Sequence, residues 1–237
     1  MITKNEIKRI KSLRNKKDRK DLKLFIAEGE KTVLDLLNSG WETESLYSIN
    51  QISNQESVLI SSKDMDRMTL LKSPSTMLGV FRIPENKISS EKGRVVVLDG
   101  VTDPGNLGTI IRLCSWFGIS TLVCSENTVD CYNPKVVQAT MGSLSQVNCI
   151  YTNLVSYLEN TNKPIYATLL EGESIYDKEI DADGIIVMGS ESHGISDEVI
   201  ACAQHRLTIP QFGVKEGTES LNVAVAASIV LGQAFRP

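Results

Sequence analysis

The sequence predicts an α/β protein in which a small α/β unit is followed by a larger domain with a mostly parallel sheet. From residue 94 to the end, short β-branched runs alternate with segments of helical periodicity. Residues 1–84 contain a shorter series of such elements. Residues 85–93 between them are polar and lack apolar periodicity, as is typical of a linker. The expected domains are therefore 1–84 and 94–237.

The N-terminal unit begins with a basic segment, residues 1–23, that carries seven Lys and three Arg against three acids. Its net charge of +7 contrasts with −11 for the remainder, given the overall −4. The segment suits phosphate binding, and solvation of an exposed helix explains the same charges equally well. The pattern that follows predicts strands at 25–27, 46–49, 58–60 and 78–83, and helices at 31–38 and 64–70.

In the C-terminal part, the run 95–98 is expected to form a strand buried on both faces. A helix should follow, because Leu107, Ile110, Ile111 and Cys114 repeat with helical spacing. Parallel sheets bind ligands beyond the carboxyl ends of their strands, so the loops after Leu98, Met188 and Ile209 are the places for chemistry. The remaining elements are predicted strands at 121–124, 165–169, 185–188 and 207–209 and an apolar final helix at 223–231.

Composition excludes several classes of protein. The apolar fraction of 41% and charged fraction of 23% are those of an ordinary globular protein. No stretch approaches the roughly 20 apolar residues of a membrane span, and the N-terminus lacks the apolar core of a secretory signal, so we expect a cytoplasmic protein. The five cysteines form no C-x-x-C pair and only two histidines are present, which argues against a metal site and a disulfide framework.

The first loop, residues 99–108, leads into the helix that carries Arg112. Arg112 is the only charged residue between Asp103 and Glu126, and its side chain can lean back toward Asn106. Such an arginine needs an anion, which could be a phosphate or an internal carboxylate. Asn106 lies near the expected helix start, where capping is an alternative role. The loop lacks the G-x-G-x-x-G and G-K-[ST] patterns of dinucleotide and P-loop sites.

The second and third loops add a carboxylate and two polar side chains. Gly189 would let a ligand approach the backbone, and Glu191 either points into a cleft or starts the next helix. His193, a lone loop histidine, is assigned no role. Ser220 and Asn222 precede the final helix, where each could cap it. The amides at this helix start could equally hold the carboxylate of an amino-acid-derived cofactor.

In this order the three loops resemble the signature motifs of the SpoU (TrmH-like) branch of the SPOUT RNA methyltransferases. Residues 106–112 (NLGTIIR) are similar to the first motif and residues 189–194 (GSESHG) to the second. The third motif is matched by Ile209-Pro210 followed by 220–226 (SLNVAVA). The opening of the N-terminal unit, LRNKKDR and LFIAEGEK, resembles the family's L30e-like substrate-binding domain.

The resemblance implies a deep trefoil knot, a homodimer with active sites near its interface, and transfer of a methyl group from S-adenosylmethionine to a ribose 2′-hydroxyl of ribosomal RNA or, second, transfer RNA. Arg112 would then hold the phosphate beside the target ribose. The family's arginine is also proposed as general base, although arginine stays protonated in proteins. The site residues implied are Asn106, Arg112, Glu191, Ser220 and Asn222 for catalysis, Thr168, Leu169, Gly189, Ile209 and Leu221 for the methyl donor, and Lys16, Lys17, Arg19 and Lys20 for RNA.

One departure and two alternatives accompany this hypothesis. The stretch between Ile209-Pro210 and Ser220 is longer than usual for the family, with an insertion at 214–217, so donor contacts there are the least secure. A catalytically inactive RNA-binding relative is disfavoured because Asn106, Arg112 and Glu191 are present together with Ser220 and Asn222. A Rossmann-type nucleotide enzyme is disfavoured because its fingerprint is absent.

Overall fold

The computed structural model describes residues 2–52, 55–84, 93–213 and 220–236. Contacts divide the chain into two units. One contains residues 1–85 together with 130–145, and the other contains 86–129 together with 146–237. The contacts thus group residues 130–145 with the first unit, whereas the predicted domain limits follow the order of the sequence.

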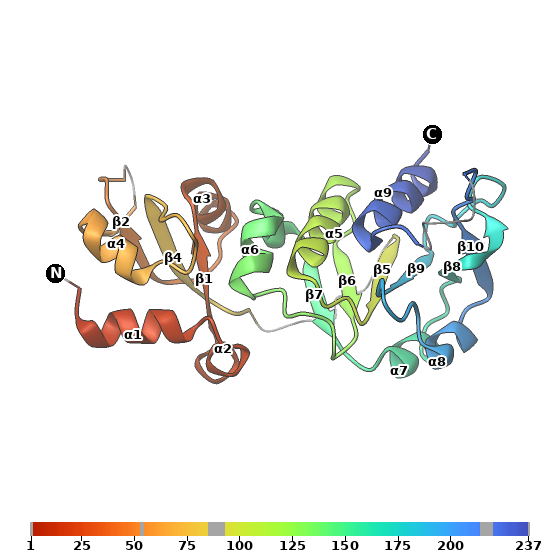
Figure 1. Ribbon diagram of the computed structural model, residues 1–237, viewed down its shortest axis with the longest axis horizontal. Helices are drawn as coiled ribbons and strands as arrows, with labels where there is room; N and C mark the ends of the chain where they lie inside the picture. The colour runs from red at the N-terminus through yellow and green to blue at the C-terminus, as the bar shows by residue number, and fades with distance from the viewer. Residues whose placement is uncertain (1, 53–54, 85–92, 214–219, 237) are drawn as a thin grey trace. The chain divides into compact units, whose positions relative to one another are not determined.

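The N-terminal unit is built on a four-stranded sheet in the order β1-β4-β2-β3 (Figure 1). Strand β4 is antiparallel to both of its neighbours, and β3 is parallel to β2. The elements in chain order are α1 (Lys4–Ser12), α2 (Lys16–Leu22), β1 (Leu24–Glu28), α3 (Glu30–Asn38), β2 (Thr43–Ser48), β3 (Val58–Leu59), α4 (Ser62–Met68) and β4 (Met77–Arg82).

Amphipathic helices cover this sheet. The Thr3 hydroxyl caps α1 by accepting from the Glu6 amide, and the helix buries Ile7 and Ile10 while its lysines face water. Its apolar face joins α4 and one face of the sheet in a single core, which also includes Leu13, Leu24, Ile26, Tyr47, Met65, Met68, Leu78 and Val80. The N-terminal basic segment is therefore helical, and α1 fixes it to the sheet.

A segment from later in the chain completes this unit. Helix α6 (Pro134–Thr140) packs on β1, and a 3-10 helix, Ser143–Gln146, follows it. The ring of Tyr132 lies 5.0 Å from that of Phe25. Gly142 has a φ of +92°, and a Cβ there would lie 2.2 Å from a carboxylate oxygen of Asp35, so only glycine fits this approach.

The C-terminal unit contains a six-stranded sheet in the order β10-β8-β9-β5-β6-β7. Every neighbouring pair in it is parallel, which confirms the predicted α/β class and mostly parallel sheet. The elements are β5 (Val95–Asp99), α5 (Pro104–Trp116), β6 (Thr121–Cys124), β7 (Asn148–Tyr151), α7 (Leu154–Glu159), β8 (Ile165–Ser174), β9 (Ile185–Gly189), α8 (Asp197–Ala201), β10 (His205–Thr208) and α9 (Val223–Ala234).

Helices cover both faces of this sheet. Helices α5 and α9 pack side by side on one face, while α7 and α8 pack on the other (Figure 1). The first four residues of β5 are buried, as expected of a central strand covered on both faces. No helix within the described residues is long and apolar enough to cross a membrane.

Candidate active site

Side chains from the three predicted loops meet in one hydrogen-bonded network. The Asn106 side-chain amide donates to Glu191 Oε1 at 2.7 Å. The Asn222 amide donates to the same oxygen at 2.7 Å and to Asn106 Oδ1 at 2.9 Å. The backbone amide of Val223, at the start of α9, donates to Glu191 Oε1 at 3.3 Å. Residues that are 116 positions apart in the sequence are thus brought together beyond the carboxyl ends of β5 and β9.

The capping alternatives are resolved differently for the two asparagines. Asp103 is the N-cap of α5 and accepts from the backbone amide of Asn106, so the Asn106 side chain is not the cap and turns to Glu191 instead. Asn222 is the N-cap of α9, and its Oδ1 accepts from the amides of Ala224 and Val225. Side chains of the protein therefore satisfy the first amides of α9. These amides are not left open for a ligand carboxylate.

The loop that carries Glu191 is held by close backbone approach. Ser190 and Gly194 exchange two backbone hydrogen bonds of 3.1 and 2.9 Å. A Cβ on Gly189 would lie 2.0 Å from the carbonyl carbon of Gly194, so glycine is required here by the turn itself, whether or not a ligand also approaches this backbone. Helix α8 begins at Asp197, which leaves Glu191 on a turn and away from the start of that helix.

Arg112 lies on the exposed face of α5. It forms no hydrogen bond or ion pair with another residue of the described chain. The internal carboxylates that could have neutralised it are engaged elsewhere. Glu191 accepts from the asparagine network, and Asp99 accepts from the amide and hydroxyl of Ser196 at 2.8 and 2.7 Å. No group among the described residues therefore takes the five donors of the guanidinium, which can bind an anion.

Three hydroxyls and Asp99, none of them in the motifs, support these loops. Asp99 ties the end of β5 to the loop before α8 through Ser196. After β6, Ser125 Oγ accepts from the Gly100 amide at 2.8 Å and lies 2.9 Å from the hydroxyl of Thr128, which bonds the Leu98 carbonyl. A polar residue directly after a buried strand is the signal that could have identified them.

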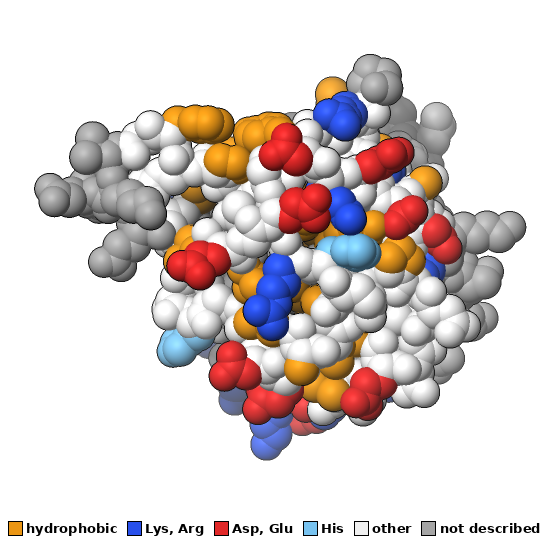
Figure 2. All heavy atoms as spheres, turned by 90° about the vertical axis from the view of Figure 1, so that its right-hand side faces the viewer, with side chains coloured by type: hydrophobic (Ala, Val, Ile, Leu, Met, Phe, Trp, Pro, Cys, Tyr) orange, Lys and Arg blue, Asp and Glu red, His pale blue; other side chains and the backbone are white. Residues whose placement is uncertain are grey.

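The residues predicted to hold the methyl donor lie at the same edge of the sheet. Thr168 donates to the Val187 carbonyl at 2.9 Å, which joins β8 to β9, and Leu169 packs against the sheet core. The predicted Leu221 exposes 42% of its surface, and Leu170 and Phe212, which were not predicted, expose 75 and 87%. Figure 2 shows this end of the unit, with apolar side chains exposed among acidic and basic ones. Exposed apolar groups beside strand ends fit a small ligand with an aromatic ring.

Other reactive groups in the described chain are disfavoured. Burial raises the pKa of the Cys114 thiol on α5 to about 12, so this thiol stays protonated and is not a nucleophile. Among the described residues no three His, Cys, Asp or Glu side chains are grouped so that they could hold a metal ion. Ser220 is exposed directly before the network, and residues 214–219 of the lengthened loop lie outside the described residues.

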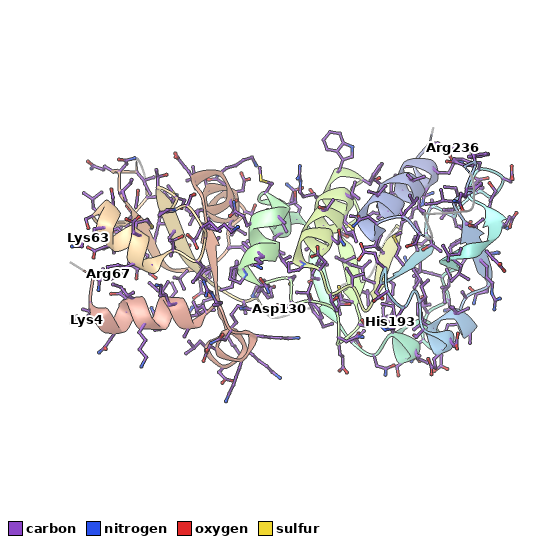
Figure 3. All side chains as sticks on the ribbon, in the orientation of Figure 1. Lys4, Lys63, Arg67, Asp130, His193 and Arg236 are labelled. Carbon is purple, nitrogen blue, oxygen red and sulfur yellow. The ribbon has the colours of Figure 1, made fainter. Side chains whose placement is uncertain are left out.

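The four predicted RNA-binding residues on α2 separate into two groups. Lys16, Lys17 and Lys20 are exposed. Arg19 is 2% exposed and donates to Asp130 Oδ2 at 2.9 and 2.6 Å and to the carbonyls of Leu13 and Arg14. The expectation for Arg19 is therefore corrected, because its buried guanidinium bonds to groups of the same unit. Asp130, labelled in Figure 3, supplies the internal carboxylate.

Comparison with known families agrees with this geometry. The sequence model of the SpoU rRNA Methylase family matches residues 93–232, and that of the MRM3-like substrate binding domain matches residues 4–79. This chain belongs to the SpoU rRNA methylase family. Membership confirms the predicted family and the class of enzyme, an RNA methyltransferase.

Similar proteins match over almost the whole chain. A Bacillus subtilis protein named 23S rRNA (guanosine(2553)-2′-O)-methyltransferase RlmP is 28% identical, over 95% of this chain and 94% of that protein. A TrmH-family structure from Porphyromonas gingivalis is 34% identical with a TM-score of 0.89, over 99 and 98% of the two chains. The AdoMet-bound structure of an rRNA methyltransferase from Sinorhizobium meliloti is 30% identical with a TM-score of 0.85, over 99 and 95%.

Proposed function

We propose that this protein transfers the methyl group of S-adenosylmethionine to a ribose 2′-hydroxyl of ribosomal RNA. The observation that carries the proposal is the network of Asn106, Glu191 and Asn222, together with Arg112, which lies on the same helix as Asn106 and has no partner among the described residues. Family membership supports methyl transfer to RNA. The name of the Bacillus relative supports the 2′-hydroxyl and ribosomal RNA, and the Sinorhizobium structure supports the cofactor.

The chain's own residues have distinct roles in this proposal. S-adenosylmethionine, when bound, supplies an electrophilic methyl group. Gly189, Ile209 and Leu221, with Thr168 and Leu169, bind it at the end of the sheet. Arg112 holds the phosphate next to the target ribose through a bidentate contact and so aligns the hydroxyl for in-line attack. Asn106, Glu191, Ser220 and Asn222 fix the start of α9 and the first loop around the reacting ribose.

Methyl transfer to isolated ribosomal subunits and to free ribosomal RNA, with labelled S-adenosylmethionine, tests the proposal. We expect label in ribosomal RNA at a single nucleotide that resists alkaline cleavage, as a 2′-O-methylated nucleotide does. Transfer RNA is the comparison substrate, and a Glu191→Ala variant is the control for contaminating methyltransferases. Label on a base, or equal label with the variant, would contradict the proposal.

The proposal also covers RNA binding by exposed lysines and the arrangement of the domains. Lys16, Lys17 and Lys20 on α2 bind RNA phosphates, which is supported by their exposure and by the substrate-binding model that matches this region. The family models that match residues 4–79 and 93–232 support the domain limits 1–84 and 94–237, and family membership supports the trefoil knot. With ribosomal RNA as substrate, we place the protein in the cytoplasm.

A homodimer is the remaining part of the proposal. Trp116 and Val225 expose 84 and 47% of their surface on the adjacent helices α5 and α9, and Arg112 lies one turn before Trp116. A second copy of this chain would bury these apolar side chains beside the active site. Sedimentation should show a dimer for the wild type and a monomer for Trp116→Glu. A folded Trp116→Glu protein that stays dimeric would exclude this face.

A further inference from the structure

A hollow of about 630 Å³ lies at one end of the N-terminal sheet. Three neighbouring strands form its floor, because the amide of Ile83 donates to the Lys23 carbonyl at 2.8 Å and that of Arg82 donates to the Glu42 carbonyl at 2.9 Å. Lys23 and Glu42 directly precede β1 and β2, while Arg82 ends β4 and Ile83 follows it. Their backbones are thus held in register by the sheet, and the hollow lies within a single unit.

An aromatic ring and two cations line this hollow. The indole of Trp41 is half-buried and meets Phe25 edge-on, with ring centroids 5.4 Å apart at 80°. Lys23 is exposed, and the Arg82 side chain, which is 51% exposed, uses its Nε to pair with Glu42 at 2.7 Å. A fixed aromatic ring beside cations is the combination with which proteins bind unpaired nucleotides, by stacking on the base and attracting its phosphates.

The backbone of Lys23 supplies an independent observation. It ends α2 in the left-handed conformation, with φ +53°, where glycine is the favourable residue. A lysine there destabilises the fold relative to glycine and gains no packing, because its side chain is exposed. Strained residues cluster at functional sites, so this conformation makes the Lys23 side chain a candidate for a role at the edge of the hollow.

We propose that this hollow binds one unstacked nucleotide of the substrate RNA, with its base against Trp41 and its phosphates at Lys23 and Arg82. The inference rests on the RNA substrate proposed above and adds a site outside the active site and the α2 lysines. A duplex presents no free base face to an indole. The occupant is therefore a single-stranded segment, such as a loop or bulge.

Fluorescence tests the stacking. The chain has two tryptophans, so a Trp116→Phe variant leaves Trp41 as the only indole. We expect a short single-stranded oligouridylate to quench this fluorescence to saturation, and the same length of duplex RNA to leave it unchanged. Binding of the single strand without quenching would overturn the proposal, since a purely structural Trp41 has no contact with bound RNA.

A pair of variants tests the lysine. Met141 is the other non-glycine residue of the described chain with a positive φ, also +53°, and it carries no charge. Lys23→Gly and Met141→Gly remove the same kind of backbone strain, and neither should lower the thermal midpoint. Only Lys23→Gly should weaken oligouridylate binding several-fold, with the slope of log Kd against log salt reduced by about 0.7. Equal affinities for the two variants would exclude Lys23 from the site.

The methyl-transfer assay separates this inference from the proposed function. If the protein methylates ribosomal RNA while Trp41 is not quenched and Lys23→Gly binds as Met141→Gly does, the nucleotide site alone is wrong. If no RNA is methylated but both binding measurements succeed, the proposed activity is wrong and the nucleotide site stands.

Discussion

The two units use the same charged residue types in opposite ways. In the N-terminal unit, Arg19 and Glu28 are 2 and 4% exposed and bond to other groups of that unit. In the C-terminal unit, Arg112 and Glu191 are exposed at the candidate active site. Glu191 is held by two asparagine side chains and one backbone amide, and Arg112 by nothing in the described chain. Arg19 and Glu28 are thus buried and bonded within their own unit. Arg112 and Glu191 stay at the surface, where a substrate can reach them.

The contrast explains how one sequence feature can carry two meanings. An arginine in a basic segment and an arginine on an apolar helix both predict phosphate binding. What separates them is a carboxylate far away in the sequence, because Asp130 reaches Arg19 across 111 positions while no carboxylate of the described residues bonds to Arg112. The partner, more than the local charge, decides whether a cation is structural or functional.

Removal of Arg19 should have the largest effect on stability. Arg19→Ala leaves the Asp130 carboxylate, whose side chain is 14% exposed, without its partner. We expect the free energy of unfolding to fall by about 3–5 kcal/mol, measured by denaturant titration. The double variant Arg19→Met, Asp130→Leu should lose much less, because no unpaired charge remains. A stable Arg19→Ala protein with weakened RNA binding would instead restore Arg19 to the RNA site.

Removal of Arg112 should affect catalysis and leave stability unchanged. We expect methyl transfer by Arg112→Ala to fall by about 100-fold, because the phosphate beside the ribose loses its bidentate contact. The thermal midpoint should not change, since the guanidinium bonds to nothing in the described chain. Arg236→Ala is the matched control: Figure 3 places Arg236 at the end of the C-terminal unit opposite His193, which follows Glu191 by two residues. Wild-type activity of Arg112→Ala would remove its proposed role.

Most of the fold could be predicted because its elements are periodic and strongly patterned. The strand at 95–98 and the helix after residue 104 both appear where the sequence placed them. Strand β7 was not predicted, because its run NCIY contains a single β-branched residue, whereas the equally short β6, TLVC, contains two. The return of residues 130–145 to the N-terminal unit could not be predicted either. It depends on contacts such as that of Tyr132 with Phe25, which no local pattern encodes.

The sequence predicted which side chains of the three loops meet, but not which hydrogen bonds they form. Parallel topology and motif resemblance identified Asn106, Glu191 and Asn222, since strand ends meet at one edge of a sheet. Which side chain caps which helix was not predictable, because Asp103 and Asn106 are both good capping residues and only the fold selects one. Ser125, which directly follows β6 and accepts from the Gly100 amide, was also missed, although a polar residue after a buried strand could have indicated it.

Adding a methyl group at Gly189 tests whether the close approach of the Gly189 and Gly194 backbones positions the exposed Glu191. Gly189→Ala places a Cβ 2.0 Å from the Gly194 carbonyl carbon, so the turn that carries Glu191 must shift. We expect a loss of about 1–3 kcal/mol in the free energy of unfolding, together with reduced methyl transfer. Gly232→Ala on α9 is the control, because a Cβ there meets nothing within 4 Å and alanine favours a helix. Equal stability of both variants would show that the turn tolerates a side chain.

The smallest expected effect concerns the buried glutamate. Burial raises the pKa of Glu28 above its ordinary value of 4.5, against hydrogen bonds from Thr69 and Leu70 that lower it. The folded state therefore binds this proton more tightly than the unfolded state, so the contribution to stability is full at low pH and is lost as the pH rises from 4.5 through the raised pKa. Glu28→Gln should remove this slope, which cannot exceed about 1.4 kcal/mol per pH unit. If Glu28→Gln instead keeps the wild-type dependence of unfolding free energy on pH, burial does not shift the pKa of Glu28. The contrast between the two units then does not hold for Glu28 and Glu191.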